Sequence, residues 1–198
     1  MKIGNVEIKN RVVMAPMLMG FGTFSGDATE QMINYYEERA KGGTGLIITE
    51  ITRVNDLTGA SSFGQLSASK DRNIPSISRL AERIHKHGAK LFVELHHPGR
   101  QNVNLMINTV PISYAMDKIM PGNSYSKLLY GSIVPLGKKM VEKDMFFKTV
   151  APSKCERSKF SESSNKALTE KQIKKIISQF GDAALRVKKA GCDGVELH

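Results

Sequence analysis

The sequence has few of the features that mark secreted, membrane-embedded or disulfide-stabilised proteins. Only two cysteines, Cys155 and Cys192, occur in 198 residues. That is too few for a disulfide framework or for a four-thiolate zinc or iron–sulfur site on this chain, so we expect two free thiols. No apolar run approaches the roughly 18 to 20 residues of a membrane helix, and the first residues lack the apolar stretch of a signal peptide. We therefore expect a cytoplasmic protein with no membrane partner.

The composition is otherwise that of a globular domain, with 40% hydrophobic and 24% charged residues. The formal net charge is +10, and residues 98–168, with 11 basic and 5 acidic side chains, supply six of these charges. A basic surplus confined to one segment with little aromatic interleaving is typical of a solvated loop rather than of a nucleic-acid site. We expect no nucleic-acid partner, whereas a small anionic substrate is compatible with the charge.

Hydrophobic patterning predicts an alternation of strands and helices. Four apolar runs have the length and β-branched content of buried strands, at residues 12–17, 45–50, 90–96 and 193–198. A helical pattern precedes each of the last three, and these helices begin near Thr29, Ile74 or Pro75, and Thr169 and end at Gly42, Gly88 and Gly191. The alternation predicts the α/β class, with a parallel sheet covered by helices on at least one face.

One long interruption and the end of the chain bear on the architecture. About seventy residues, 98–168, separate the third strand from the third helix, far more than the usual βα loop, and this excursion has short predicted strands at 132–136 and 145–150. The chain stops at His198, at the end of a strand that reads as central. A complete eight-stranded α/β barrel takes roughly 250 residues. We therefore expect residues 1–198 to be one partial domain, the first half of a TIM (β/α)8 barrel, truncated after its fourth strand.

Polar side chains gather where the predicted strands end, which is where parallel α/β folds bind ligands. The strand bodies are aliphatic by contrast. The residues delivered to the strand ends are Ala15, Pro16, Met17 and Leu18; Glu50 and Ile51; Glu94, His96 and His97; and Glu196 and His198. Strand ends are generally wetter than strand bodies, which would explain any one of these residues but less well the whole set.

Two other kinds of site were weighed. The glycines of residues 20–26, followed by Glu50, superficially match a dinucleotide-binding unit, but the predicted helix starts near Thr29, after the glycines, so a flexible loop is the better interpretation. Glu94, His198 and one of the adjacent His96 and His97 could ligate zinc. Without a further ligand motif this metal site ranks below a cofactor pocket, and we predict no metal. His85 and His87 are expected on the surface.

Six ordered motifs, spread over nearly the whole chain, carry a resemblance to a known family. They are Asn10-Arg-Val-Val-Met-Ala-Pro-Met17, the segment 35–43, Gly45-Leu-Ile-Ile-Thr-Glu50, Glu94-Leu-His-His-Pro-Gly-Arg100, Val150-Ala-Pro-Ser153 and the segment 190–198. Together they resemble the old yellow enzyme family, and most closely its bacterial NADH:flavin oxidoreductase and 2,4-dienoyl-CoA reductase branch.

The resemblance implies a barrel that takes hydride from NADH or NADPH onto FMN and passes it to the β-carbon of an activated alkene. His198 is implied as the catalytic residue that lies over the flavin and donates to the substrate carbonyl, which stabilises the developing enolate-like charge. His97 and Arg100 are implied to hold the loop after the third strand. The positions implied to contact the flavin are Ala15, Pro16, Met17, Leu18, Ile51 and Glu94.

Three of these positions depart from the family pattern. Glu94 stands where the family usually has Gln, and an ionised Glu accepts hydrogen bonds but cannot donate them. Leu18 offers no hydroxyl or thiol to the flavin, and Ile51 is bulkier than the small residue common there. These departures predict altered flavin affinity and redox potential.

The resemblance also defines what lies beyond this chain. The family's second donor, its proton-delivering Tyr and the FMN phosphate site follow the position of His198, and iron–sulfur and FAD groups are implied only where a longer C-terminal part exists. The implied partner is a small unsaturated carbonyl compound, and the basic surplus favours an acid or thioester. The alternative is an inactive or interaction-only half-barrel, whose open edges would favour self-association; a metal-dependent barrel hydrolase ranks third.

Overall fold

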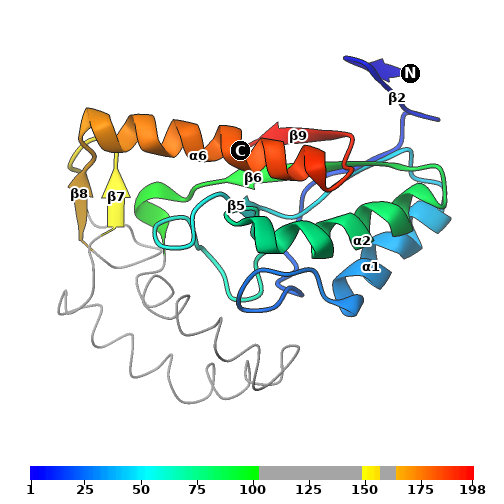
Figure 1. The fold of residues 1–198 in the computed structure, drawn as a ribbon, viewed down its shortest axis with the longest axis horizontal. Coiled ribbons are helices and arrows are strands. Elements are labelled where there is room, and N and C mark those ends of the chain that lie inside the picture. Colours follow the sequence, from blue (N-terminus) through cyan, green and yellow to red (C-terminus); the bar gives the residue numbers. More distant parts are fainter. Residues whose placement is uncertain (103–148, 157–163) are drawn as a thin grey trace.

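The computed structural model describes residues 1–102, 149–156 and 164–198 (Figure 1). The predicted strand at 132–136 and residues 145–148 of the next one lie outside the described residues. The described residues form the α/β arrangement that the sequence predicts.

A parallel sheet forms the centre of the fold, in the order β3–β4–β6–β9. A fifth strand, β5, pairs in parallel with the carboxyl end of β6, where Arg53 faces His96. The strand bounds are β3 Val13–Met14, β4 Leu46–Ile48, β5 Thr52–Arg53, β6 Lys90–His96 and β9 Gly194–Leu197. The predicted α/β class and the parallel sheet are therefore confirmed.

Three helices cover one face of this sheet (Figure 1). Their bounds are α1 Glu30–Lys41, α2 Ile74–His85 and α6 Glu170–Lys189. Thr29 caps α1 by accepting from the amide of Met32, and Thr169 forms a reciprocal capping box with Gln172 at the start of α6. Because hydroxyl side chains satisfy otherwise unpaired amides of a first turn, both predicted starts are confirmed.

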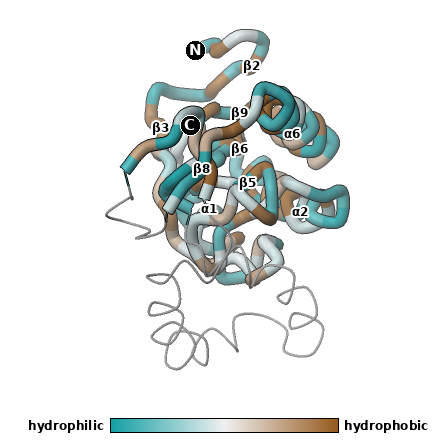
Figure 2. The backbone as a smooth tube through the Cα atoms, turned by 90° about the vertical axis from the view of Figure 1, so that its left-hand side faces the viewer, coloured by the Kyte–Doolittle hydropathy of each residue, from teal (hydrophilic) through white to brown (hydrophobic). Residues whose placement is uncertain are grey.

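Alternation along β6 divides its side chains between two environments. Leu91, Val93 and Leu95 are buried among the apolar residues of the helices, whereas Glu94 and His96 lie on the opposite face. The smoothed backbone in Figure 2 shows the same division in the helices, where hydrophobic and hydrophilic positions alternate along α2 and α6. One face of β6 thus supports the fold and the other is available for polar chemistry.

Several elements differ from the sequence-based expectation. β3 and β4 are shorter than predicted, because residues 15–18 and Glu50 leave the ladder to form the loops at the carboxyl ends. A short antiparallel pair, β1 (Lys2–Ile3) with β2 (Val6–Glu7), precedes the sheet. The remaining elements are the 3-10 turns η1 Asp71–Asn73 and η2 Gly99–Gln101, and the parallel pair β7 Thr149–Ala151 and β8 Asn165–Ala167.

Close packing at β9 depends on a glycine. Gly194 pairs with Phe92 of β6, and a Cβ atom at position 194 would lie 2.7 Å from the Phe92 ring. The ring therefore lies close to the backbone of β9, and a larger residue at position 194 would require the Phe92 ring to move.

Histidines and acids are paired at the amino ends of the strands, which corrects the expectation that His85 and His87 are plain surface residues. His85 Nε2 lies 2.6 Å from Asp193 Oδ2, and Lys90 Nζ lies 2.9 Å from the other oxygen of Asp193. His87 contacts Glu37, which also pairs with Arg83 across α1 and α2. Both imidazoles are partly buried by acids that are distant along the chain. The sequence pattern around α2 does not show these partners, which is why the sequence alone predicts both histidines on the surface.

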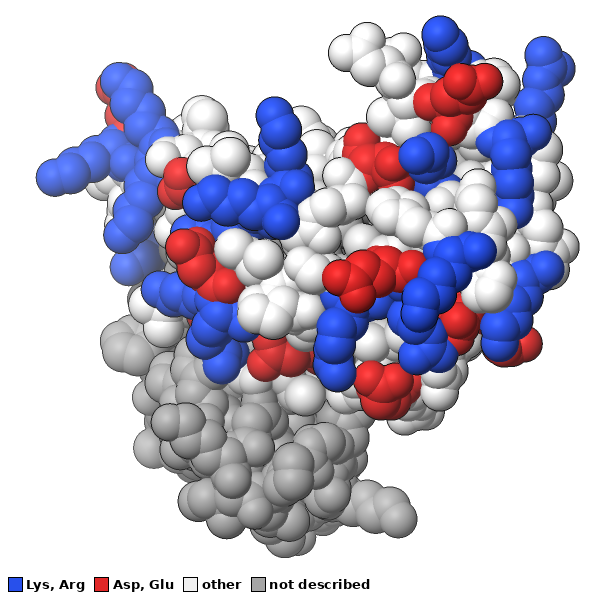
Figure 3. Space-filling model, turned by 45° about the vertical axis from the view of Figure 1, so that its right-hand side comes forward, with Lys and Arg blue, Asp and Glu red and all other residues white. Residues whose placement is uncertain are grey.

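Charged residues of both signs are interspersed over the face shown in Figure 3. Pairs such as Arg79 with Glu30, 3.2 Å apart, contribute to this mixture. Among the helices of the described ranges, none combines the length and apolar character that a membrane span requires.

Asp193 yields a test of this packing. Burial opposes its ionisation, but hydrogen bonds from the Leu91 amide, Lys90 and His85 outweigh burial and lower the pKa of Asp193. We predict that Asp193→Asn lowers the free energy of unfolding at pH 7 by about 1 to 3 kcal/mol, since hydrogen bonds to a charged group are lost. Because the folded-state pKa is lowered, the stabilisation is present above the ordinary pKa of aspartate and is lost as pH falls through the lowered value.

Urea unfolding at pH 7 and at about pH 3 measures this effect. Asp182→Asn, at an exposed position of α6, serves as the control and should change stability little. Equal loss in the two variants, or a loss in Asp193→Asn that does not shrink at low pH, would contradict the role of Asp193.

Candidate active site

The parallel strands bring the predicted site residues to one edge of the sheet. β6 and β9 pair in register, so that Glu94 lies beside Glu196 and Leu95 beside Leu197. The backbone amide of His198 then donates to the carbonyl of Leu95 at 3.1 Å, which fixes where the chain lies after β9. The carboxyl end of β9 is thereby held against that of β6.

Glu94 and His198 meet at this edge. Nε2 of His198 lies 3.9 Å from Oε1 of Glu94, and the His198 side chain is 57% exposed whereas that of Glu94 is buried. Burial raises the pKa of Glu94; the His198 imidazole lowers it and the nearby Glu196 raises it, and the net shift is upward. Glu94 therefore keeps its proton to a higher pH than an ordinary glutamate, and a protonated carboxyl can donate as well as accept hydrogen bonds.

A second imidazole adjoins this pair. The rings of His96 and His198 meet edge to face, with centroids 4.7 Å apart. Burial, together with the neighbouring His198 and His97, lowers the pKa of His96 to about 4. Nδ1 of His96 is buried and has no hydrogen-bond partner among the described residues. Since an unmet lone pair costs less than an unmet N–H, we place the single proton of this neutral ring on Nε2.

His97 and Arg100 lie in the loop that follows β6. Nδ1 of His97 accepts from the Gly99 amide at 3.2 Å, so its proton is on Nε2, which donates to Thr58 Oγ1 at 2.9 Å. Arg100 reaches toward the Glu156 carbonyl, 3.5 Å away. His97 thus joins two loops at the carboxyl edge.

The predicted flavin contacts after β3 are largely open to solvent. Met17 and Leu18 are 55% and 44% exposed. Ala15 is also exposed, whereas Pro16 and, after β4, Ile51 are partly buried. No hydrogen bond or ion pair among the described residues joins these positions to Glu94 or His198. The structure therefore brings Glu94 and His198 into contact and places the other predicted residues on loops at the same edge.

The glycine-containing loop at residues 20–26, expected to be flexible, is held by specific contacts. The Gly22 amide donates to the Gly64 carbonyl at 2.8 Å, and Arg53 donates to the Phe24 carbonyl at 3.3 Å. Gly64 has φ +71°, and a Cβ there would lie 2.2 Å from the Gly20 carbonyl oxygen. The two loops pack backbone to backbone.

Arg53 is an organising residue that sequence reasoning missed. Its buried guanidinium lies 2.9 Å from Asp56 and also donates to the carbonyl of Gln65 at 3.0 Å. A charged side chain in a short strand gives no hydrophobic signal. Its neighbours Thr52 and Val54 are of mixed polarity, so the local sequence does not single it out.

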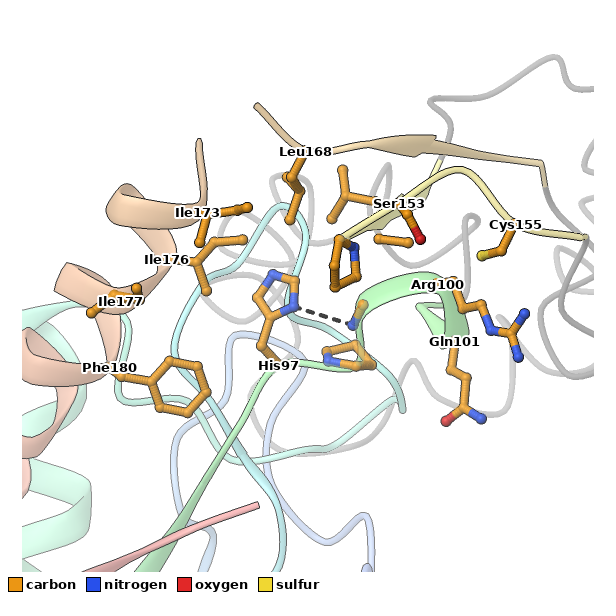
Figure 4. Close-up of a pocket in the computed structure, with 15 residues that line it drawn as sticks. His97, Arg100, Gln101, Ser153, Cys155, Leu168, Ile173, Ile176, Ile177 and Phe180 are labelled. Carbon is orange, nitrogen blue, oxygen red and sulfur yellow. Dashed lines mark hydrogen bonds between the residues drawn. The ribbon is translucent and has the colours of Figure 1, made fainter. Parts of the chain in front are cut away.

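A separate cavity of about 590 Å³ lies between the loop after β6, β7 and α6 (Figure 4). Figure 4 shows the His97 ring pointing toward Ile176 and Leu168, with Arg100 and Gln101 directed away. Its lining is mostly apolar and includes none of the predicted flavin contacts and not His198. This cavity is therefore not the predicted cofactor site.

No group of three or more metal-ligating side chains occurs in residues 1–102, 149–156 and 164–198. Glu94 and His96 each lie near His198, but these side chains do not form a metal-binding group.

The fold and the site define an α/β-barrel enzyme segment, with helices on one face of a parallel sheet and ionisable residues at the carboxyl ends of its strands. The whole chain, residues 1–198, matches the NADH:flavin oxidoreductase / NADH oxidase family. The chain belongs to this family.

Individual relatives agree with the family match. The chain is 32% identical over 197 residues to an NADH oxidase of Thermoanaerobacter brockii and 33% identical over 200 residues to an NADPH dehydrogenase of Listeria monocytogenes serotype 4a. It covers 24% and 46% of those proteins, respectively, while all of the chain is matched. The chain thus spans less than half the length of these curated relatives.

Solved structures show the same partial coverage. The old yellow enzyme from Pichia sp. AKU4542 superposes with a TM-score of 0.73 at 26% identity, over 100% of this chain and 44% of that one. Morphinone reductase, at 23% identity, superposes with a TM-score of 0.71 and shares the fold. The described sheet corresponds to part of such a TIM barrel.

The environment of His96 predicts a pH effect. Between pH 6.5 and about 4, His96 is protonated in the unfolded chain but neutral in the folded chain. The free energy of unfolding should therefore fall as the solution is acidified through this range. The contribution of this one residue is at most about 3 kcal/mol. NMR titration of the imidazole should show a pKa near 4, and His96→Asn should lose less stability than wild type over the same range. Titration of His96 near the ordinary 6.5 would contradict its burial.

Proposed function

We propose that this chain is part of an FMN-dependent oxidoreductase that reduces the activated C=C bond of an α,β-unsaturated carbonyl compound, with NADH or NADPH as the source of hydride. The observation that carries the proposal is the pairing of Glu94 and His198, 3.9 Å apart on adjacent parallel strands. One is buried and the other is exposed beside it. Such a pair offers a polar edge for a cofactor and an open donor for a substrate.

The residues present fit the ring system of a flavin. Met17 and Leu18 expose apolar side chains at the carboxyl edge, and Glu94 supplies a polar group next to the sheet. The raised pKa of Glu94 extends its protonated form to higher pH than for an ordinary glutamate, and when protonated that carboxyl can both donate to a ring oxygen and accept from a ring N–H. In this state it takes over the hydrogen-bonding pattern of the glutamine that the family usually has at this position.

When bound, FMN supplies the hydride transfer itself. The chain's own residues would bind the cofactor and orient the substrate. His198, the proposed catalytic residue, presents an exposed imidazole that can donate to the substrate carbonyl, and a donor aimed at developing negative charge lowers the barrier. The His96 ring beside it is neutral at pH 7, so it places no second positive charge next to His198.

The substrate class is proposed from charge. With a net charge of +10, the chain favours anionic compounds, so an unsaturated acid or thioester is the proposed substrate.

The first test is an absorbance spectrum of the purified full-length product of the gene, followed by NAD(P)H oxidation with and without an unsaturated acid or thioester. If the protein binds FMN, an absorbance band near 450 nm is expected. This band is diagnostic of the cofactor, since protein side chains do not absorb there. Alkene-dependent oxidation is expected in wild type and should fall by about tenfold or more in His198→Ala, the loss from one electrostatic donor. Colourless protein that takes up no added FMN would overturn the proposal.

Glu94 yields a sharper prediction. If its protonated form contacts the flavin, FMN affinity of the wild type should fall as pH rises through the raised pKa of Glu94, because the donor is lost and a negative charge appears beside the ring. Glu94→Gln should bind FMN with little dependence on pH and, at high pH, more tightly by about 1 to 3 kcal/mol. Its flavin potential should also be less negative.

FMN titrations of both proteins from about pH 5 to 9 measure this difference. Glu196→Gln, on the neighbouring strand, is the matched control, since it removes a nearby negative charge without removing the proposed contact. Unchanged or weaker FMN binding by Glu94→Gln at high pH would rule out the flavin-edge position of Glu94.

A further inference from the structure

Glu50 is a fully buried carboxyl with no part in the chemistry described above. It follows β4 directly and is 0% exposed. Its oxygens receive three backbone amides: Oε2 accepts from Met19 at 2.7 Å and from Gly20 at 3.0 Å, and Oε1 accepts from Leu66 at 3.1 Å. One side chain thus joins the loop after β3 to the loop after β5.

The surroundings of Glu50 hold it in one place. Its own amide donates to the Tyr36 hydroxyl at 2.7 Å, and Tyr36 is itself fully buried in the core beneath α1. Burial raises the pKa of Glu50, and the three amides lower it only in part. A buried acid that costs free energy to ionise is retained here in a position where a shorter or apolar side chain would leave three amides unpaired.

The anchored amides come immediately after the predicted flavin contacts. Met14 is fixed in the ladder by pairing with Ile47, and Met19 is fixed by Glu50. The four residues between them, 15–18, lie outside the strands, and all but Pro16 are exposed. Their path is therefore defined mainly by its two ends, one of which depends on Glu50.

We infer that Glu50 is a positioning residue, which sets the loop of residues 15–18 in the shape that receives the cofactor ring. This inference rests on the proposed function for the identity of the cofactor. The anchoring itself is independent of that identity. Glu50 touches neither cofactor nor substrate in this account and acts through the backbone of Met19 and Gly20.

Amide hydrogen exchange tests the anchoring without any ligand. In wild type the amides of Met19, Gly20 and Leu66 should exchange slowly although they lie in loops, because each donates to an oxygen of the buried Glu50 carboxyl. Glu50→Ala should speed exchange at all three by about tenfold or more, the loss that corresponds to one net hydrogen bond each. Glu50→Gln keeps one acceptor oxygen but turns an NH2 group toward the other loop, so it should release either Met19 and Gly20 or Leu66, but not all three.

FMN titration of the same full-length proteins tests the functional part. Glu50→Ala should weaken FMN binding about tenfold or more, and Glu50→Gln should be intermediate. The matched control is Glu37→Gln, which removes a buried acid paired with Arg83 and His87 at the amino end of the sheet. The control should lose stability without a change in FMN affinity or in exchange at Met19 and Gly20.

The outcomes separate the two levels of the inference. Rapid exchange of Met19 and Gly20 in wild type, or unchanged exchange in both variants, would overturn the anchoring, and the wild-type measurement decides even if Glu50→Ala does not fold. Faster exchange with unchanged FMN affinity would overturn the positioning role. A wild type that binds no FMN would overturn the proposed function and the cofactor-related half of this inference, while the exchange data would still support or overturn the anchor.

Discussion

Strand β6 pairs in parallel with β4 and β5 on one side and with β9 on the other. Because parallel strands share a direction, this pairing sends every connecting loop of the site to the same edge of the sheet. The strict alternation of a strand then directs Val93 and Leu95 to the helices and Glu94 and His96 away from them. The position of the ionisable residues therefore follows from the hydrogen-bonded ladder, and no separate local device is needed to bring Glu94 and His198 together.

Much of this architecture could be predicted from the sequence, because it rests on short-range patterns. The periodicity of Ile77, Leu80, Ala81 and Ile84 defines a buried helix face, and Thr29 and Thr169 mark helix starts through hydrogen bonds within one turn. β1, β2 and β5, with two residues each, are too short to show alternation. The pairing of β5 with β6 also joins segments that are distant along the chain, so no local sequence pattern indicates it.

The site divides in the same way. Glu94 and His198 could be proposed because each ends an apolar run and because the motifs around them resemble those of a known family, to which the chain belongs. The anchoring by Glu50 and Arg53 could not, since their contacts join loops 16 to 31 residues apart along the chain. In the sequence Glu50 is only a polar strand end. Its burial and its three amide partners come from loop packing, which no periodicity encodes.

The backbone contact between Gly22 and Gly64 makes the shapes of two loops depend on each other. A side chain at Gly22 would meet the Gly64 carbonyl oxygen at 2.6 Å, and one at Gly64 would meet the Gly20 carbonyl oxygen at 2.2 Å. A smaller residue at one position cannot make room for a larger residue at the other, because both are already glycine and the obstacle is a main-chain carbonyl. A change in the length of one loop would likewise displace the backbone of the other. A graft of either loop from a relative would therefore have to carry its counterpart with it.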